Sequence, residues 1–149
     1  MAEIKPELKY EEFIKELTSN KGPFSSIAHL YVFAAAFGFS KNKSKPTSKP
    51  RKDQVRDITF KNQGLESNIF TIALADKQSL ECLKDKDYCY KIFEGYVNGG
   101  LELLKKLNEK FRDELFYEEI LNIMYDVSQK NTPYDPENSL GNIKFWSIL

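Results

Sequence analysis

Apolar side chains recur at intervals of three and four residues in four stretches of the chain. This spacing places them along one face of an α-helix and leaves charged residues on the opposite face. A short fifth helix is predicted around residues 80–83, where Ser79 offers a side-chain oxygen as the N-cap. The four longer stretches are residues 10–17, 65–75, 88–107 and 113–127, and in the last one we expect Leu115, Ile120, Ile123 and Met124 to point inward.

Residues 27–37 read IAHLYVFAAAF and are apolar almost all round. Such a helix is expected at the centre of the fold, because it has no polar face to present to water. Either Ser25 or Ser26 is placed to cap its start. Gly38 is placed to end it. The three successive alanines, residues 34–36, would let another helix approach closely.

Two adjacent glycines, Gly99 and Gly100, fall in the middle of the predicted helix 88–107. Together they cost such a helix about 2 kcal/mol relative to alanine. We therefore expect either a kink or a very close helix contact at this point.

The segment Ser40–Lys52 reads SKNKSKPTSKPRK and contains no apolar side chain. With two prolines and six Lys or Arg residues it cannot form a core element, so we expect a mobile basic loop over residues 40–53. The chain has 22 basic and 22 acidic side chains and no net charge, yet no acidic residue occurs between Glu16 and Asp53. The charge is therefore polarised along the chain.

Cations in such a loop suit the neutralisation of phosphates, because each contact releases a condensed counterion. The interleaved hydroxyls add hydrogen-bond donors for phosphate oxygens. No aromatic residue lies in the loop, so stacking on single-stranded bases is not indicated there. A solvated loop without a ligand and an acidic protein partner are the alternatives. The candidate nucleic-acid-binding residues are Lys41, Lys43, Lys45, Lys49, Arg51, Lys52 and Arg56.

Residues 55–60 read VRDITF and alternate between apolar and polar, which predicts a short strand that needs a partner. The expected fold is mainly α: a compact helical domain of about five to six helices over residues 1–130, with the basic loop and one short strand or hairpin. A chain of 149 residues is long enough to bury a core without disulfides or metals.

Residues 131–149 open with turn residues and end in the apolar sequence IKFWSIL. This end is too apolar to trail freely in water. It either folds back onto the domain or inserts into a partner or a second subunit of a homo-oligomer. Aromatic anchors are typical of such interfaces, and the candidate partner-binding residues are Phe145, Trp146 and Leu149.

Residue types for catalysis are scarce in this chain. One histidine and two cysteines do not make a dedicated zinc site, and no glycine-rich phosphate loop is present. His29 lies in the most apolar helix and is expected to be a satisfied core histidine. Cys82 and Cys89 would lie roughly 10 Å apart on one continuous helix, too far for a disulfide. We expect reduced thiols, no catalytic residues, no metal and no cofactor, and hence no enzyme.

The first residues, MAEIKPELKYEEF, are charged and unlike a secretory signal. The longest apolar run, residues 27–39, is interrupted by His29 and is shorter than the roughly 20 residues of a membrane span. A cytoplasmic protein without a membrane partner is expected.

Several segments in order resemble a known family. They are KGPFSSIAHLYVFAAAFGF, a polar loop, DITF, IFTIALAD and IFEGYVNGGLELL, and they cover roughly residues 22–104. The order resembles small proteins associated with the bacterial DNA phosphorothioation (Dnd) system and is distantly similar to DndE, its small helical component. The resemblance implies a role beside DNA sulphur modification, or in the restriction and phage-defence module that reads it. It brings no catalytic residues to this chain.

Two functional hypotheses follow. The first is a non-enzymatic accessory protein that contacts DNA, or a DNA-bound complex, through the basic loop. The second is an assembly subunit that binds other proteins of the modification or restriction system and never touches DNA.

Overall fold

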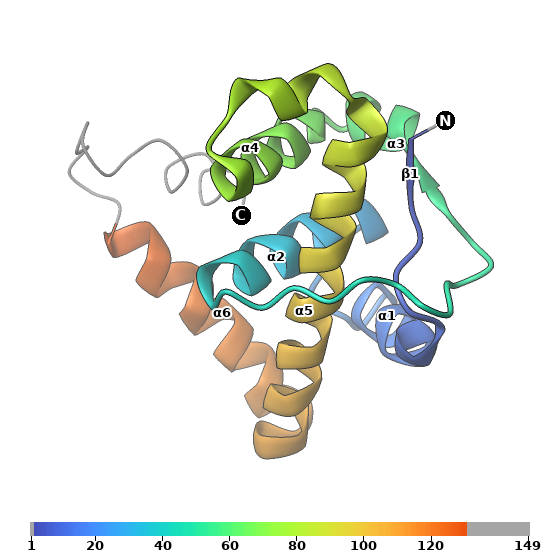
Figure 1. Ribbon diagram of the computed structural model, residues 1–149. Helices are drawn as coiled ribbons and strands as arrows, with labels where there is room; N and C mark the ends of the chain where they lie inside the picture. Colours follow the sequence, from blue (N-terminus) through green and yellow to red (C-terminus); the bar gives the residue numbers. More distant parts are fainter. Residues whose placement is uncertain (1, 131–149) are drawn as a thin grey trace.

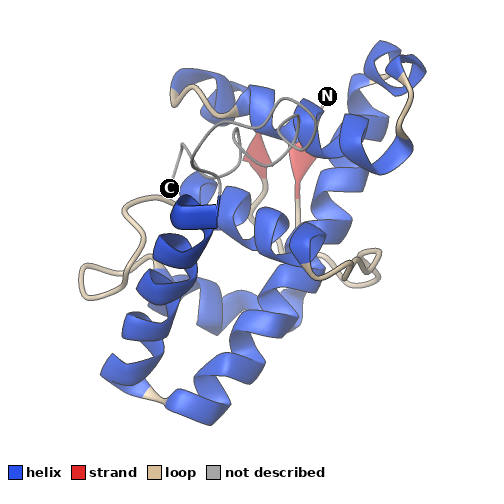
Figure 2. Cartoon of the chain, turned by 90° about the vertical axis from the view of Figure 1, so that its left-hand side faces the viewer, coloured by secondary structure: helices blue, strands red, loops and turns tan. Residues whose placement is uncertain are grey.

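The computed structural model describes residues 2–130, and among these the side chains of all but residues 113 and 126–130. The fold is mainly α, as expected (Figures 1 and 2). The candidate residues Phe145, Trp146 and Leu149 lie outside the described residues. In chain order the elements are β1 (Glu3–Ile4), η1 (Leu8–Tyr10), α1 (Glu11–Leu17), α2 (Ile27–Ser40), β2 (Val55–Arg56), α3 (Asp57–Asn62), α4 (Glu66–Lys77), η2 (Leu80–Lys84), α5 (Lys86–Phe111) and α6 (Asp113–Lys130).

Helix α2 lies at the centre of the fold, as its uniformly apolar sequence predicted. Ten of its residues are buried, namely Ala28 and residues 30–38. Ser26, not Ser25, caps it by accepting a hydrogen bond from the His29 backbone N–H at 3.2 Å. The long helix α5 crosses α2, and α6 turns back from the far end of α5 to form a V with it (Figure 1). Rings fill the remaining core, where Phe60 meets Tyr90 and Phe93 edge to face.

The crossing of α2 and α5 is the very close helix contact that the paired glycines predicted. A Cβ atom on Gly100 would lie 1.7 Å from the Ala34 carbonyl oxygen, which is impossible without moving one helix. Gly38 lies in the same helix contact, since a Cβ there would lie 2.5 Å from the Tyr96 carbonyl oxygen. The expectation that Gly38 ends α2 is therefore wrong: the helix continues to Ser40, and the chain turns at Asn42, whose φ is 55°.

The predicted strand over residues 55–60 is correct only at its start. Val55–Arg56 pairs antiparallel with Glu3–Ile4 near the N-terminus, with Ile4 opposite Val55. From Asp57 the chain is helical, because Asp57 favours a helix N-terminus and Lys61 pairs with it one turn later at 3.7 Å. The partner that the strand needs is β1.

Three of the four residues expected to point inward from α6 do so: Ile120 is buried, and Ile123 and Met124 pack against the core. Leu115 does not. Leu115 is 60% exposed, whereas its neighbour Phe116 and Ile120 are buried. Phe116 packs on Phe13 of α1, with ring centroids 6.0 Å apart. With Phe116 turned toward Phe13, its neighbour Leu115 faces outward.

Candidate nucleic-acid interface

The basic segment, defined from here on as residues 41–52, crosses α5 on its way from α2 to β2 (Figure 1). Its backbone lies directly on the helix: Lys45 N–H donates to the Gly95 carbonyl at 3.0 Å. A Cβ on Gly99 would lie 1.9 Å from the Lys43 carbonyl oxygen. Gly95 and Gly99 have no side chains, so the backbone of the basic segment can lie directly on α5. We call the surface formed by these two glycines the seat. Gly100 contacts α2 instead.

Asn98 fastens the segment to this seat. Its amide nitrogen donates to the Lys45 carbonyl at 3.0 Å and to Thr47 Oγ1 at 2.7 Å. Its amide oxygen accepts the Glu7 backbone N–H at 2.9 Å. The side chain is 1% exposed, so one buried amide joins α5, the basic segment and the N-terminal residues.

Glu7 completes the fastening from the other side. Its carboxylate accepts the backbone N–H groups of Ser48 and Lys49. These hydrogen bonds, that of Ser48 first, hold the Glu7 pKa below its ordinary value. Leu8 N–H also donates to the Lys49 carbonyl at 2.7 Å. The segment forms no helix, but these hydrogen bonds define its path. Nothing in the sequence indicated them.

Arg51 is not on the surface, which corrects its place in the predicted DNA-binding set. It is 4% exposed and donates to the Tyr31 hydroxyl at 2.7 Å and to Glu11 Oε1 at 2.9 Å. This pairing lowers the pKa of Glu11, and burial raises the pKa of Tyr31 to about 12. Arg51 links the basic segment to α1 and α2, and its buried charge is already paired with Glu11.

Three of the predicted lysines gather around one depression, which we call the first hollow. It has a volume of about 790 Å³, and Lys45 and Lys49 line it together with Lys9 from η1. Lys105 of α5 joins them, because its ammonium lies 5.9 Å from the ring centroid of Tyr10 in the wall. The third predicted residue, Lys43, lies beside them across Glu102. The full lining is Glu7, Leu8, Lys9, Tyr10, Lys45, Pro46, Ser48, Lys49 and Asn98.

Glu102 organises the lysines at the edge of this hollow. Its carboxylate pairs with Lys45 at 2.9 Å, with Lys43 at 3.5 Å and with Lys106 at 3.7 Å. The hydrogen bond from Lys45 is the main cause of its lowered pKa. One carboxylate thus holds three ammonium groups together, and the cluster keeps a positive charge.

Lys41 stands apart from these lysines, at a second hollow of about 440 Å³. Lys52 and Arg56 are exposed and line neither hollow. Within the described residues, Lys41, Lys49, Lys52 and Arg56 make no ion pair. The structure therefore divides the predicted set between the first hollow, the second hollow, the edge of the small sheet and, for Arg51, the core.

Lys9 and Lys105 were not among the predicted residues. Lys9 precedes the predicted helix 10–17, and Lys105 lies on the charged face of the predicted helix 88–107, which looked ordinary. The spacing of Glu102, Lys105 and Lys106 did place one acid and two cations on a single helical face. Nothing in the sequence showed that this face meets the basic segment.

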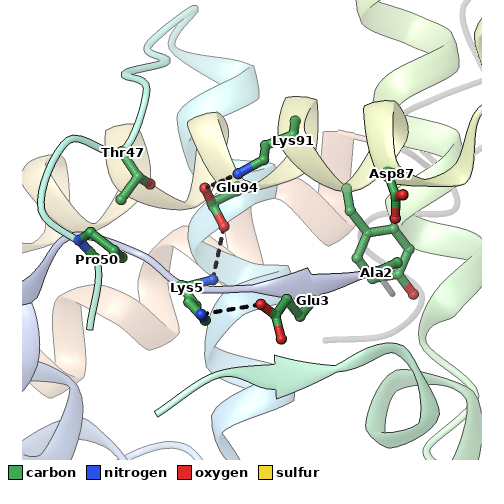
Figure 3. A pocket seen from close by; sticks show the side chains of 9 residues that line it. Ala2, Glu3, Lys5, Thr47, Pro50, Asp87, Lys91 and Glu94 are labelled. Carbon is green, nitrogen blue, oxygen red and sulfur yellow. Dashed lines mark hydrogen bonds and ion pairs between the residues drawn. The ribbon is translucent and has the colours of Figure 1, made fainter. Parts of the chain in front are cut away.

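A third pocket, of about 420 Å³, lies between β1 and the first half of α5 (Figure 3). Its nearly buried Glu94 accepts the Lys5 backbone N–H at 2.8 Å and faces Lys91 at 3.7 Å. Lys5 is itself paired with Glu3 at 3.2 Å. Three carboxylates and two paired lysines line this pocket, so its charge does not suit a phosphate.

The two thiols and the histidine each make local hydrogen bonds. Cys82 and Cys89 lie on η2 and α5, not on one helix as the spacing argument assumed, and Cys89 Sγ donates to the Cys82 carbonyl at 3.1 Å. Burial raises the pKa of Cys89 to about 11, which disfavours its thiolate. His29 Nδ1 lies 2.7 Å from Ser26 Oγ. In the described part of the chain no group of three His, Cys, Asp or Glu could hold a metal, and no helix there could cross a membrane.

The sequence was compared with protein-family models, with curated proteins and with solved structures. No curated protein and no solved structure matches it. One family model, described as DNA sulphur modification system-associated protein 4, matches residues 3–142. The match includes the seat on α5, the basic segment and both hollows, and it ends before Phe145, Trp146 and Leu149. The chain thus belongs to the DNA sulphur modification system-associated protein 4 family.

Proposed function

We propose that this protein is a non-enzymatic accessory protein of its DNA sulphur-modification system and that it contacts DNA through the first hollow. Membership of the family associates the chain with such a system, and the other proteins of that system are its expected partners. The observation that carries the proposal is the set of lysines around the first hollow, Lys9, Lys45, Lys49 and Lys105. Lys45 and Lys49 lie on a backbone that Asn98 and Glu7 hold in place.

Fastened lysines bind phosphates better than lysines on a free loop, because less conformational entropy is lost on binding. The local excess of positive charge supports an anionic ligand: three lysines and one glutamate line the hollow, and the glutamate is occupied by backbone N–H groups. Lysine ammonium groups act as point charges on the backbone and do not read base edges. The proposed contact is therefore with duplex phosphates and is independent of sequence.

A direct binding assay tests this proposal. Fluorescence anisotropy with a labelled 20-base-pair duplex at low salt compares wild type with a variant in which Lys9, Lys45, Lys49 and Lys105 are all replaced by serine. A matched control replaces four other exposed lysines, Lys15, Lys21, Lys61 and Lys84. Both variants lose the same net charge, so only the position of the lost charges differs.

We expect the hollow variant to bind at least tenfold more weakly than the control variant. Equal loss in the two variants, or no binding by wild type at low salt, contradicts DNA contact at this site. The second result favours an assembly subunit that meets the system only through proteins. Parallel duplexes with and without a phosphorothioate show whether the modification changes the affinity.

A further inference from the structure

The second hollow differs from the first in its apolar floor. Phe37, Leu103, Leu107 and Ile123 line it. Three lysines, Lys41, Lys106 and Lys110, and one glutamate, Glu119, stand around them, so the charge of the lining is positive. An apolar floor gains nothing from a phosphate, whereas a ring of lysines disfavours a purely apolar ligand. The lining as a whole fits a protein surface that carries apolar side chains flanked by acids.

The outer face of α6 has that composition. Leu115, Leu121 and Tyr125 are each 60–63% exposed, although the other large apolar side chains described between residues 114 and 125 pack against the core. Glu114 and Glu118 are exposed as well. The spacings Glu118–Leu121, Leu121–Tyr125 and Glu118–Tyr125 are three, four and seven residues, which place these side chains on one helical face.

A helix cannot bring its outer face into its own hollow. The inner face of α6 already contributes Glu119 and Ile123 to the lining of the second hollow. Leu121 and Tyr125 point away from that hollow on the same helix. If the two surfaces meet, they do so between two molecules.

We propose that the outer face of α6 in one copy of this chain docks into the second hollow of another copy. Leu121 and Tyr125 enter the apolar floor, and Glu114 and Glu118 lie against the lysines around it. This would be an amphipathic helix bound in a groove. Tyrosine is a common anchor in such contacts.

The two surfaces are different parts of the chain, so the contact is head to tail. Each molecule in such a contact keeps one unused hollow or one unused helix face, and association continues until a ring closes. This distinguishes the proposal from an ordinary two-fold dimer, in which both molecules use the same surface.

Sedimentation velocity of the full chain without DNA, from about 1 to 200 μM, tests the proposal. The hollow variant carries Lys41→Glu and Lys110→Glu, and the helix variant carries Leu121→Ser and Tyr125→Ser. All four side chains are exposed, so both variants should fold, and circular dichroism verifies this. The control variant carries Leu80→Ser and Lys21→Glu, which are exposed positions far from either surface in the sequence.

We expect wild type and the control variant to associate beyond a dimer as concentration rises, and each interface variant to associate at least tenfold more weakly. An equimolar mixture of the two variants should form dimers and stop there, because each retains the surface that the other has lost. A monomeric wild type, or a mixture that stays monomeric, overturns the proposal. So does association that appears only after removal of residues 131–149, because those residues would then be the occupant of the hollow. No DNA is used, so failure here leaves the proposed DNA contact untouched.

Discussion

Arg51 and Lys49 lie two residues apart in the same basic segment, yet the structure gives their charges opposite uses. Arg51 is buried against Tyr31 and Glu11 and joins the basic segment to α1 and α2. The Lys49 side chain is exposed beside the first hollow, while its backbone N–H is held by Glu7. The density of cations in the sequence therefore did not distinguish a buried structural residue, here called an anchor, from an exposed residue that could contact a ligand. Replacing an anchor should change stability, whereas replacing a displayed lysine should change binding.

The largest expected effect on stability is at the crossing of α2 and α5, the contact on which the seat depends. Gly100→Val places a Cβ 1.7 Å from the Ala34 carbonyl oxygen, which is backbone and cannot move alone. We expect a loss of more than about 4 kcal/mol in the free energy of unfolding, or no folded protein. Gly64→Ala is the control, because its Cβ would meet nothing within 4 Å. Its φ is +70°, so we expect this variant to lose only about 1 kcal/mol in the free energy of unfolding. Urea denaturation followed by circular dichroism measures both.

Arg51→Met should lower the free energy of unfolding by about 2 kcal/mol, because it removes the hydrogen bonds to Glu11 and to the buried Tyr31 hydroxyl. Lys49→Met should change stability by less than about 0.5 kcal/mol. The two variants are compared in their free energy of unfolding and in the DNA affinity of the folded protein. Equal losses of stability would mean that Arg51 is no anchor.

Asn98 links the two roles, so its replacement should affect both. Asn98→Asp keeps an acceptor for the Glu7 N–H but loses the donor to the Lys45 carbonyl and to Thr47. We expect about 2 kcal/mol less stability, since each lost hydrogen bond is worth about 1 kcal/mol. DNA affinity should fall as well, because Lys45 would no longer be held beside the first hollow. A variant that loses stability but binds as wild type would show that fastening is irrelevant to binding.

The smallest expected effect is on the way the free energy of unfolding changes with pH. Glu7 and Glu102 have pKa values below their ordinary value of 4.5 in the folded protein. The stability that they contribute is present above their unfolded pKa and is lost as pH falls through the lower folded pKa. Urea denaturation between pH 3 and 6 should show this loss, and Glu7→Gln should reduce it. An unchanged profile in the variant would mean that the Glu7 carboxylate does not fasten the segment.

The sequence predicted the helices well because their apolar periodicity was strong, and it predicted the close contact because paired glycines inside a helix need a reason. It failed where tertiary contacts decided the outcome. Gly38 looked like a cap because its packing partner, α5, lies far away in the chain. Leu115 and Phe116 are equally apolar, and only the position of Phe13 determines which one is buried.

The candidate site was predictable only in part for the same reason. The density of cations identified Lys43, Lys45 and Lys49, but the first hollow also needs Lys9 and Lys105, which only the fold brings near. Arg51 was assigned to the surface because its partners, Glu11 and Tyr31, are 40 and 20 residues away.

The most direct test of the central claim is the salt dependence of duplex binding. The logarithm of the binding constant should fall linearly with the logarithm of salt concentration, with a slope of about −0.9 for each phosphate contacted. If the four lysines of the first hollow each contact a phosphate, replacing them with serine should make the slope less steep by about 3 to 4. Replacing the four control lysines should leave the slope unchanged. A slope that is the same in wild type and the hollow variant would contradict the account.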